Sequence, residues 1–172
     1  ADYWDFERQK PLVADTRFRP ALEGQVQQFR FADHGSEIIP GLAELYVLEK
    51  LQNRPKAEEY REPLQHFYDH ILDTGRTEDG LWYRSIDVNT GEPFEPGVVD
   101  TWGYILIGLH SFDLVENSER YTEEIQRTML AAAKQKSIAW EQEYQDGYAD
   151  AIESMLYLLP WFDLPKAHYW VD

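Results

Sequence analysis

Residues 146–153 hold the densest group of side chains that could do chemistry, namely Asp146, Tyr148, Asp150 and Glu153. A helix that begins at this turn places Asp150 and Glu153 on one face, because residues three and four apart are neighbours on a helix. Such carboxylates accept hydrogen bonds from pairs of sugar hydroxyls, and crowding raises the pKa of one of them towards the range of a general acid. The pattern is equally typical of a structural helix start, with Asp146 as the cap and the later acids complementing the helix dipole.

Aromatic and charged residues are combined a second time around residues 80–104, in the set Trp82, Tyr83, Arg84, Asp100 and Trp102. Aromatic rings stack on the apolar faces of sugars, while charged groups bind hydroxyls or the carboxylate of a uronate. The set therefore indicates a saccharide-binding loop. The alternative is that Trp102 belongs to the core, since it opens the most apolar stretch of the chain, and that Arg84 pairs with a nearby acid.

Histidines offer two further possibilities for chemistry. His34 lies just before the first expected helix, and its ordinary pKa near neutrality suits a general base, although a single loop histidine is more often simply exposed. His66 and His70 are four residues apart and could ligate a metal only with a third ligand. A solvated helix face explains that pair better, so the sequence predicts no metal and no cofactor.

Composition limits the partners of the chain. Its 172 residues include 32 acidic and 16 basic ones, for a net charge of −16, which repels phosphate backbones and anionic lipids. We therefore expect neither nucleic acid nor membrane as a partner. Cysteine is absent, which excludes disulfides and cysteine-based zinc sites. Aromatic residues make up 15 % of the chain, more than an ordinary core needs.

The hydrophobic pattern predicts an all-α protein. An irregular arm is expected over residues 1–35, followed by a helical domain over 36–172 that contains about three helical hairpins. A short strand-like loop near residues 81–95 interrupts the helices. The expected helices cover residues 36–52, 55–74, 98–114, 118–140 and 148–159. Apolar and more polar helices alternate, so the first, third and fifth should be inner helices and the others outer ones.

Three motifs resemble the inner-helix starts of six-hairpin glycosidase-like proteins, a group that includes heparinase-like polysaccharide lyases and related glycoside hydrolases. They are Asp79-Gly-Leu-Trp-Tyr-Arg84, Val99-Asp-Thr-Trp-Gly-Tyr104 and Asp146-Gly-Tyr-Ala-Asp-Ala-Ile-Glu153. The resemblance covers most of residues 36–172 and implies a partial (α/α)6 toroid with a groove for an oligo- or polysaccharide at one end of the inner helices. It favours a periplasmic or extracellular location. A full toroid has about twice as many hairpins, so a fragment, or a chain completed by another subunit, is expected.

Two chemistries fit this resemblance. A lyase would remove the proton beside a uronate carboxylate, with Tyr148 or His34 as the base. A hydrolase would instead use two carboxylates, for example Asp100 with Asp146 or Glu153. The negative charge of the chain opposes a polyanionic substrate and favours hydrolysis or binding of a neutral glycan. The competing interpretation is a non-catalytic helical scaffold or protein-interaction domain, whose aromatic residues are core.

Overall fold

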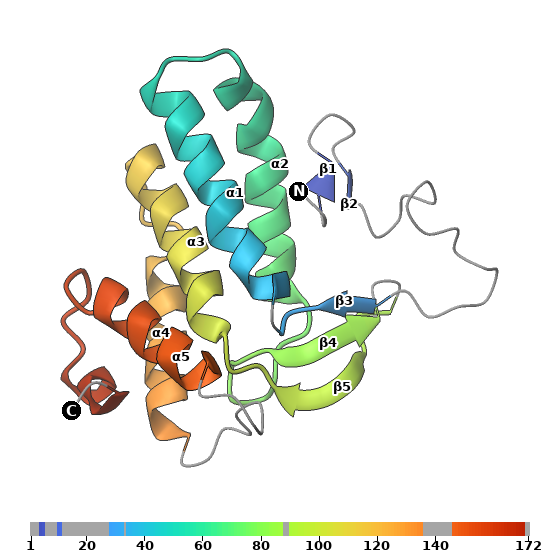
Figure 1. Ribbon diagram of the computed structural model, residues 1–172, viewed down its shortest axis with the longest axis vertical. Coiled ribbons are helices and arrows are strands. Elements are labelled where there is room, and N and C mark those ends of the chain that lie inside the picture. Colours follow the sequence, from blue (N-terminus) through green and yellow to red (C-terminus); the bar gives the residue numbers. More distant parts are fainter. Residues whose placement is uncertain are drawn as a thin grey trace.

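The computed structural model describes residues 4–5, 10–11, 28–32, 34–87, 90–135 and 146–170. Helices dominate this part of the chain, and small antiparallel sheets accompany them (Figure 1). The all-α prediction is therefore only partly right. The helices are α1 (His34–Leu51), α2 (Lys56–Asp73), α3 (Trp102–Glu116), α4 (Thr122–Lys134), α5 (Asp146–Leu158) and the 3-10 helix η2 (Pro165–Trp170). The strands are β1 (Trp4–Asp5), β2 (Lys10–Pro11), β3 (Gln28–Arg30), β4 (Tyr83–Asp87) and β5 (Pro93–Val98).

The helices α1, α3 and α5 lie side by side in one row, with α2 packed on α1 and α4 on α3 (Figure 1). The first turns of α1 and α3 are joined by a buried hydrogen bond of 2.6 Å from Ser36 Oγ to Thr101 Oγ1. Further along the same two helices, the rings of Tyr46 and Phe112 stack with centroids 5.4 Å apart. The two helices are therefore parallel, with their N-termini at the same end of the row.

The helices α3 and α5 are also parallel, and glycines allow their backbones to approach closely. Asp100, just before α3, lies against Gly147 in the first turn of α5, and later His110 meets Tyr157. A Cβ on Gly103 would stand 2.2 Å from the Ser154 Cβ, so no larger residue fits there without moving the helices apart. Only glycine thus allows this spacing between the two backbones.

The C-terminal end of the row is held by the Glu116 cluster, which consists of Glu116 and its three hydrogen-bond donors. Tyr46 Oη donates to Glu116 Oε1 over 2.6 Å, Arg61 Nε donates to Oε2 over 2.5 Å, and Lys50 Nζ also binds Oε1. Burial opposes ionisation of Glu116, but these donors outweigh it and lower the pKa of the carboxyl from 4.5 to about 2. The cluster ties α1, α2 and α3 together.

A second buried carboxylate, Asp113, organises the turn from α3 to α4. Its oxygens accept a hydrogen bond of 2.5 Å from Ser118 Oγ and one of 2.8 Å from the backbone N–H of Tyr121. Asn117 ends α3 in the left-handed conformation, with φ of 51°. The ring of Tyr121 then packs against Tyr68 of α2, which places the start of α4 on the core.

The strand-like loop expected near 81–95 is an antiparallel hairpin of β4 and β5, and β3 adds a third strand to it. Phe29 of β3 pairs with Ile86, and both are buried. The prediction of an irregular arm over 1–35 is wrong for the strands β1, β2 and β3, and the third helix begins at 102 rather than 98 because Val98 ends β5. No described helix has the length and apolarity that a membrane-crossing segment requires.

Candidate functional site

The N-termini of α1, α3 and α5 come together beside the sheet, at the end where the sequence predicts a binding groove (Figure 1). Asp100 lies at the centre of this end and is only 1 % exposed. A Cβ on Gly147 would lie 2.3 Å from Asp100 Oδ2, so this carboxylate rests against the first turn of α5. The positive end of a helix dipole stabilises such a carboxylate. The prediction of Asp100 as a catalytic residue is therefore replaced by a structural role, because substrate cannot reach it.

Tyr104 connects α3 to the acidic face of α5. Its hydroxyl lies 3.1 Å from Asp150 Oδ1 and 3.3 Å from Glu153 Oε2. The prediction that Asp150 and Glu153 share one helix face is thus confirmed. Burial is the main cause that raises the pKa of Tyr104 above its ordinary 10.0, and the hydrogen bond to Asp150 adds to it. Tyr104 therefore stays protonated and has one proton to offer to two carboxylates.

Trp82 does not lie at a loop tip. Its side chain is 0 % exposed, and its indole N–H donates a hydrogen bond of 2.9 Å to the carbonyl of Ile71. The guanidinium of Arg76 lies over the ring, 4.0 Å from its centroid, and burial lowers the pKa of Arg76 to about 10. The predicted stacking of a sugar on Trp82 is wrong for this conformation, because no face of the ring is open.

The other aromatic and basic residues of that set are also placed by packing. Trp102 is fully buried in the core, as the alternative interpretation expected. Tyr83 and Arg84 lie half-buried on β4, where the Arg84 side chain packs over Gly97 of β5. Tyr83 and Arg84 therefore belong to the sheet, and Trp102 to the core, and none of the three lies on the face shared by Tyr104, Asp150 and Glu153.

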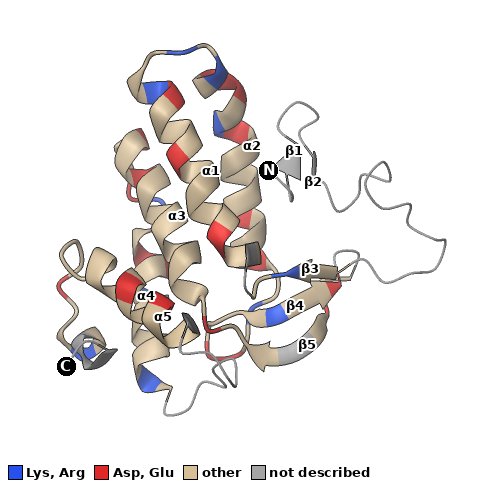
Figure 2. Ribbon diagram, viewed as in Figure 1, with Lys and Arg blue, Asp and Glu red and all other residues tan. Residues whose placement is uncertain are grey.

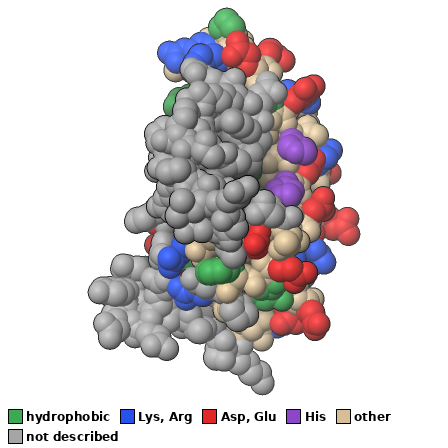
Figure 3. All heavy atoms as spheres, turned by 90° about the vertical axis from the view of Figure 1, so that its right-hand side faces the viewer, with side chains coloured by type: hydrophobic (Ala, Val, Ile, Leu, Met, Phe, Trp, Pro, Cys, Tyr) green, Lys and Arg blue, Asp and Glu red, His purple; other side chains and the backbone are tan. Residues whose placement is uncertain are grey.

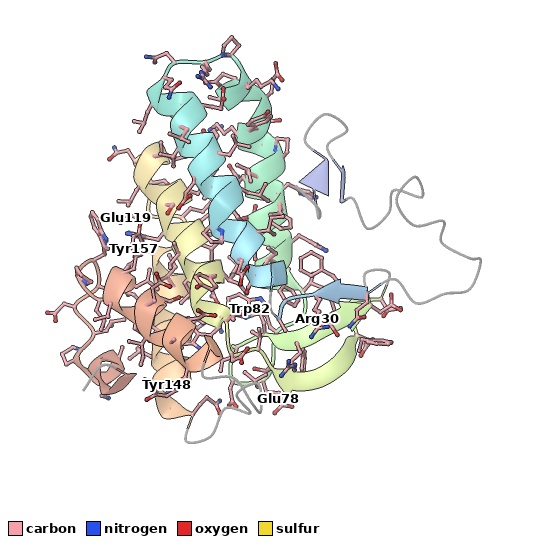
Figure 4. The ribbon with its side chains drawn as sticks, in the orientation of Figure 1. Arg30, Glu78, Trp82, Glu119, Tyr148 and Tyr157 are labelled. Carbon is pink, nitrogen blue, oxygen red and sulfur yellow. The ribbon has the colours of Figure 1, made fainter. Side chains whose placement is uncertain are left out.

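Tyr148 lies on α5 but on its other flank. It is 47 % exposed, and it stands about 200° around the helix from Asp150, given 3.6 residues per turn. Figure 4 shows Tyr148 at the start of α5 and Trp82 beside the sheet, in separate parts of the molecule. The backbones of Asp146 and His34 begin α5 and α1, but their side chains lie outside the described residues.

His66 and His70 are exposed on α2, and Figure 3 shows histidine side chains at the surface close to acidic ones. Within the described residues, no three histidine, aspartate or glutamate side chains are arranged to hold a metal ion. Tyr104 was expected to belong to the core with Trp102, because only the packing of α5 on α3 brings its hydroxyl to the two acids. The spacing of Asp150 and Glu153 was the available signal. Comparison of the chain with protein-family models, curated proteins and solved structures finds no match.

Proposed function

We propose that this chain is a carbohydrate-active protein that binds a saccharide at the N-terminal end of α3 and α5. The proposal rests on the position of the Tyr104 hydroxyl, which lies between Asp150 and Glu153 on a partly exposed face. Adjacent carboxylates accept hydrogen bonds from neighbouring sugar hydroxyls, and a neutral tyrosine both donates and accepts. Polar groups of these kinds, held by rigid helices, suit recognition of a polyhydroxylated ligand.

The arrangement of the helices supports a partial toroid of the (α/α)6 type. Parallel inner helices with their N-termini at one end are what such a toroid requires, and α1, α3 and α5 have this arrangement. In this proposal, the saccharide lies at that end. The described hairpins supply about half of a closed ring, so the groove is completed by further helices.

The charges favour a neutral glycan over a uronate. Neither α3 nor α5 contains lysine or arginine, and Figure 2 shows acidic positions on α5. A lyase needs a cation or metal to neutralise the uronate carboxylate, and these two helices supply no cationic side chain. Asp150 and Glu153 lie on the same side of any ligand, whereas hydrolysis needs a carboxylate on each side of the bond. Saccharide binding is therefore the first function proposed, ahead of hydrolysis.

The second candidate is a non-catalytic helical scaffold, and the burial of Trp82 and Trp102 favours it. Both rings fill the core, so the high aromatic content has a structural use there. In this alternative, Asp150 and Glu153 hold α5 against α3 through Tyr104. The two candidates differ in whether the face of α5 binds any ligand.

Calorimetric titration of neutral and uronate-containing oligosaccharides into the whole chain separates the two candidates. We expect a neutral oligosaccharide to bind, and Asp150→Asn or Glu153→Gln to weaken its binding at least about tenfold through a lost charge-assisted hydrogen bond. Glu123→Gln, the same kind of change at an exposed position on α4, is the matched control and should leave binding unchanged. No heat with any saccharide would reject the proposal and leave the scaffold.

A further inference from the structure

His110, on α3, is a buried titratable side chain that belongs neither to the Glu116 cluster nor to the face of Tyr104. It is only 6 % exposed. Three aromatic rings contact its imidazole, with centroids 6.3 Å away for Tyr157 and 5.1 Å away for both Trp161 and Phe162. The Nε2 atom of the ring is buried and has no hydrogen-bond partner within the described residues. The imidazole is therefore held in apolar, aromatic surroundings.

Two of these three rings belong to the C-terminal strap, which comprises residues 159–167 and runs from the end of α5 into η2 (Figure 1). Phe162 and Ala167 of the strap are buried. The helix η2, in which the strap ends, packs on α4. The strap therefore links α5 to α4, and His110 of α3 contacts it at Trp161 and Phe162.

The backbone hydrogen bonds of the strap are local. The Trp161 N–H donates to the carbonyl of Leu158 over 2.9 Å, and the Ala167 N–H donates to that of Leu164 over 2.8 Å. These bonds shape the strap but do not attach it to α3. The packing of its rings on His110 makes that attachment, so the state of the imidazole determines how well the strap is held.

We propose that His110 is a pH-sensitive latch, whose neutral imidazole holds the C-terminal strap on α3 and whose protonation releases it. A protonated imidazole donates hydrogen bonds from both nitrogens, and its Nε2 meets no acceptor in the described part of the chain. An unpaired charge in such surroundings costs free energy, and opening of the strap removes this cost by admitting water. Release uncovers the apolar surface beneath Phe162 and Ala167.

The charged groups near the imidazole offset its burial only in part. Asp113, also on α3, favours the protonated ring, but its oxygens already accept hydrogen bonds at the turn to α4. The helix α5 contributes the titratable side chain of Tyr157, and on the strap Asp163 and Lys166 are both exposed. Burial therefore outweighs the charge of Asp113 and lowers the pKa of His110 below its ordinary 6.5.

The sign of the pH dependence follows from this shift. When the strap is released, the ring of His110 is in water and regains its ordinary pKa, so the released state binds the proton more readily. The stabilisation of the closed strap is fully present above pH 6.5 and is lost as the pH falls from 6.5 towards the lower pKa of the closed state. Over that interval, each pH unit raises the equilibrium constant for release by up to about tenfold, because release takes up one proton.

NMR of the whole native chain between pH 8 and pH 5 tests the latch directly. The His110 ring should titrate below pH 6.5, and the hydrogen-exchange protection factors of the Trp161 and Ala167 amides should fall by up to about tenfold per pH unit over the same range. The Val99 amide, which donates to the carbonyl of Trp82, is the internal control and should not follow this titration. A ring that titrates above pH 6.5 would show that the aromatic rings stabilise its charge, and would overturn the proposal.

His110→Phe separates titration from packing, because it keeps a neutral ring against the strap. Its strap amides should stay protected at every pH between 8 and 5, whereas His66→Phe, the same change at an exposed position of α2, should keep the native response. His110→Gln is a second neutral variant in case the phenyl ring packs poorly. A pH response of the strap that survives in these His110 variants would contradict the proposal. This inference does not depend on whether the chain binds saccharide.

Discussion

The two ends of the inner-helix row use the same pair of groups, a tyrosine hydroxyl and a carboxylate, in different surroundings. At the C-terminal end, Tyr46 donates to Glu116, and at the N-terminal end Tyr104 lies between Asp150 and Glu153. Burial is the largest cause that raises the pKa of both tyrosines, so both hydroxyls remain protonated. The difference between the two ends therefore comes from the other groups around each carboxylate.

At the C-terminal end, two basic side chains surround the carboxylate. Lys50 and Arg61 both bind Glu116, and this carboxylate is nearly buried, so its charge is satisfied within the fold. The N-terminal pair lies between α3 and α5, which contain no lysine or arginine, and it faces a partly exposed surface. A tyrosine–carboxylate pair thus stabilises the fold where cations surround it, and is available to a ligand where it lies at the surface without them.

Trp82→Ala should have the largest effect on stability. The buried indole fills the space between α2 and the sheet and supports Arg76, so its loss should lower the free energy of unfolding by about 3–5 kcal/mol. Urea denaturation measures this change. A loss below about 1 kcal/mol together with lost saccharide binding would instead restore Trp82 as a site residue.

Glu116→Gln should come next, with a loss of about 1–2 kcal/mol, because Lys50 and Arg61 are partly exposed and solvent screens their charges. The amide cannot satisfy both Lys50 and Arg61, and Tyr46 loses a charged acceptor. The matched control is Glu123→Gln, which changes an exposed glutamate of α4 and should alter stability by less than about 0.5 kcal/mol. If the free energy of unfolding falls equally little in both variants, the Glu116 cluster does not hold the C-terminal end of the row together.

The same cluster predicts a dependence of stability on pH. Because the pKa of Glu116 is lowered to about 2 in the folded chain from 4.5 when unfolded, its stabilisation is fully present above pH 4.5. It should be lost as the pH falls from 4.5 towards 2. The difference in unfolding free energy between the native chain and Glu116→Gln, measured over this range, should shrink steadily. A difference in unfolding free energy that stays constant over this range would show that these contacts do not lower the pKa of Glu116.

Tyr104→Phe should have the smallest effect on stability, below about 1 kcal/mol, since it removes one hydroxyl at a partly exposed position. It should weaken saccharide binding several-fold, because Asp150 and Glu153 lose the group that positions them. Thermal melting and calorimetry measure the two effects. A large loss of stability with unchanged binding would make Tyr104 a structural residue only.

The sequence predicted helices well where the pattern was local. The expected helices 36–52 and 55–74 lie within two residues of α1 and α2, because periodic apolar residues and Pro55 mark them. It also identified the start of α5 and the shared face of Asp150 and Glu153. These features depend on residues close in the chain, and helical spacing alone determines them.

Features that depend on residues distant in the chain could not be predicted from local spacing. β3 is a strand because it pairs with β4, more than fifty residues later, so its three residues alone carried no signal. Trp82 appeared to be a loop residue, but Arg76 and the carbonyl of Ile71 enclose it. Asp100 is buried because Gly147 allows α5 to approach it. Each of these outcomes was decided by packing between elements.

Titration of the best-binding neutral oligosaccharide into three chains tests the central claim, that one end of the row binds ligand and the other stabilises the fold. The chains are the native one, the Asp150→Asn, Glu153→Gln double variant and Glu116→Gln, each measured where it is folded. We expect lost binding with a nearly unchanged melting temperature for the double variant, and native-like binding with a lowered melting temperature for Glu116→Gln. Unchanged binding in the double variant, or equal losses of binding in both, would contradict it.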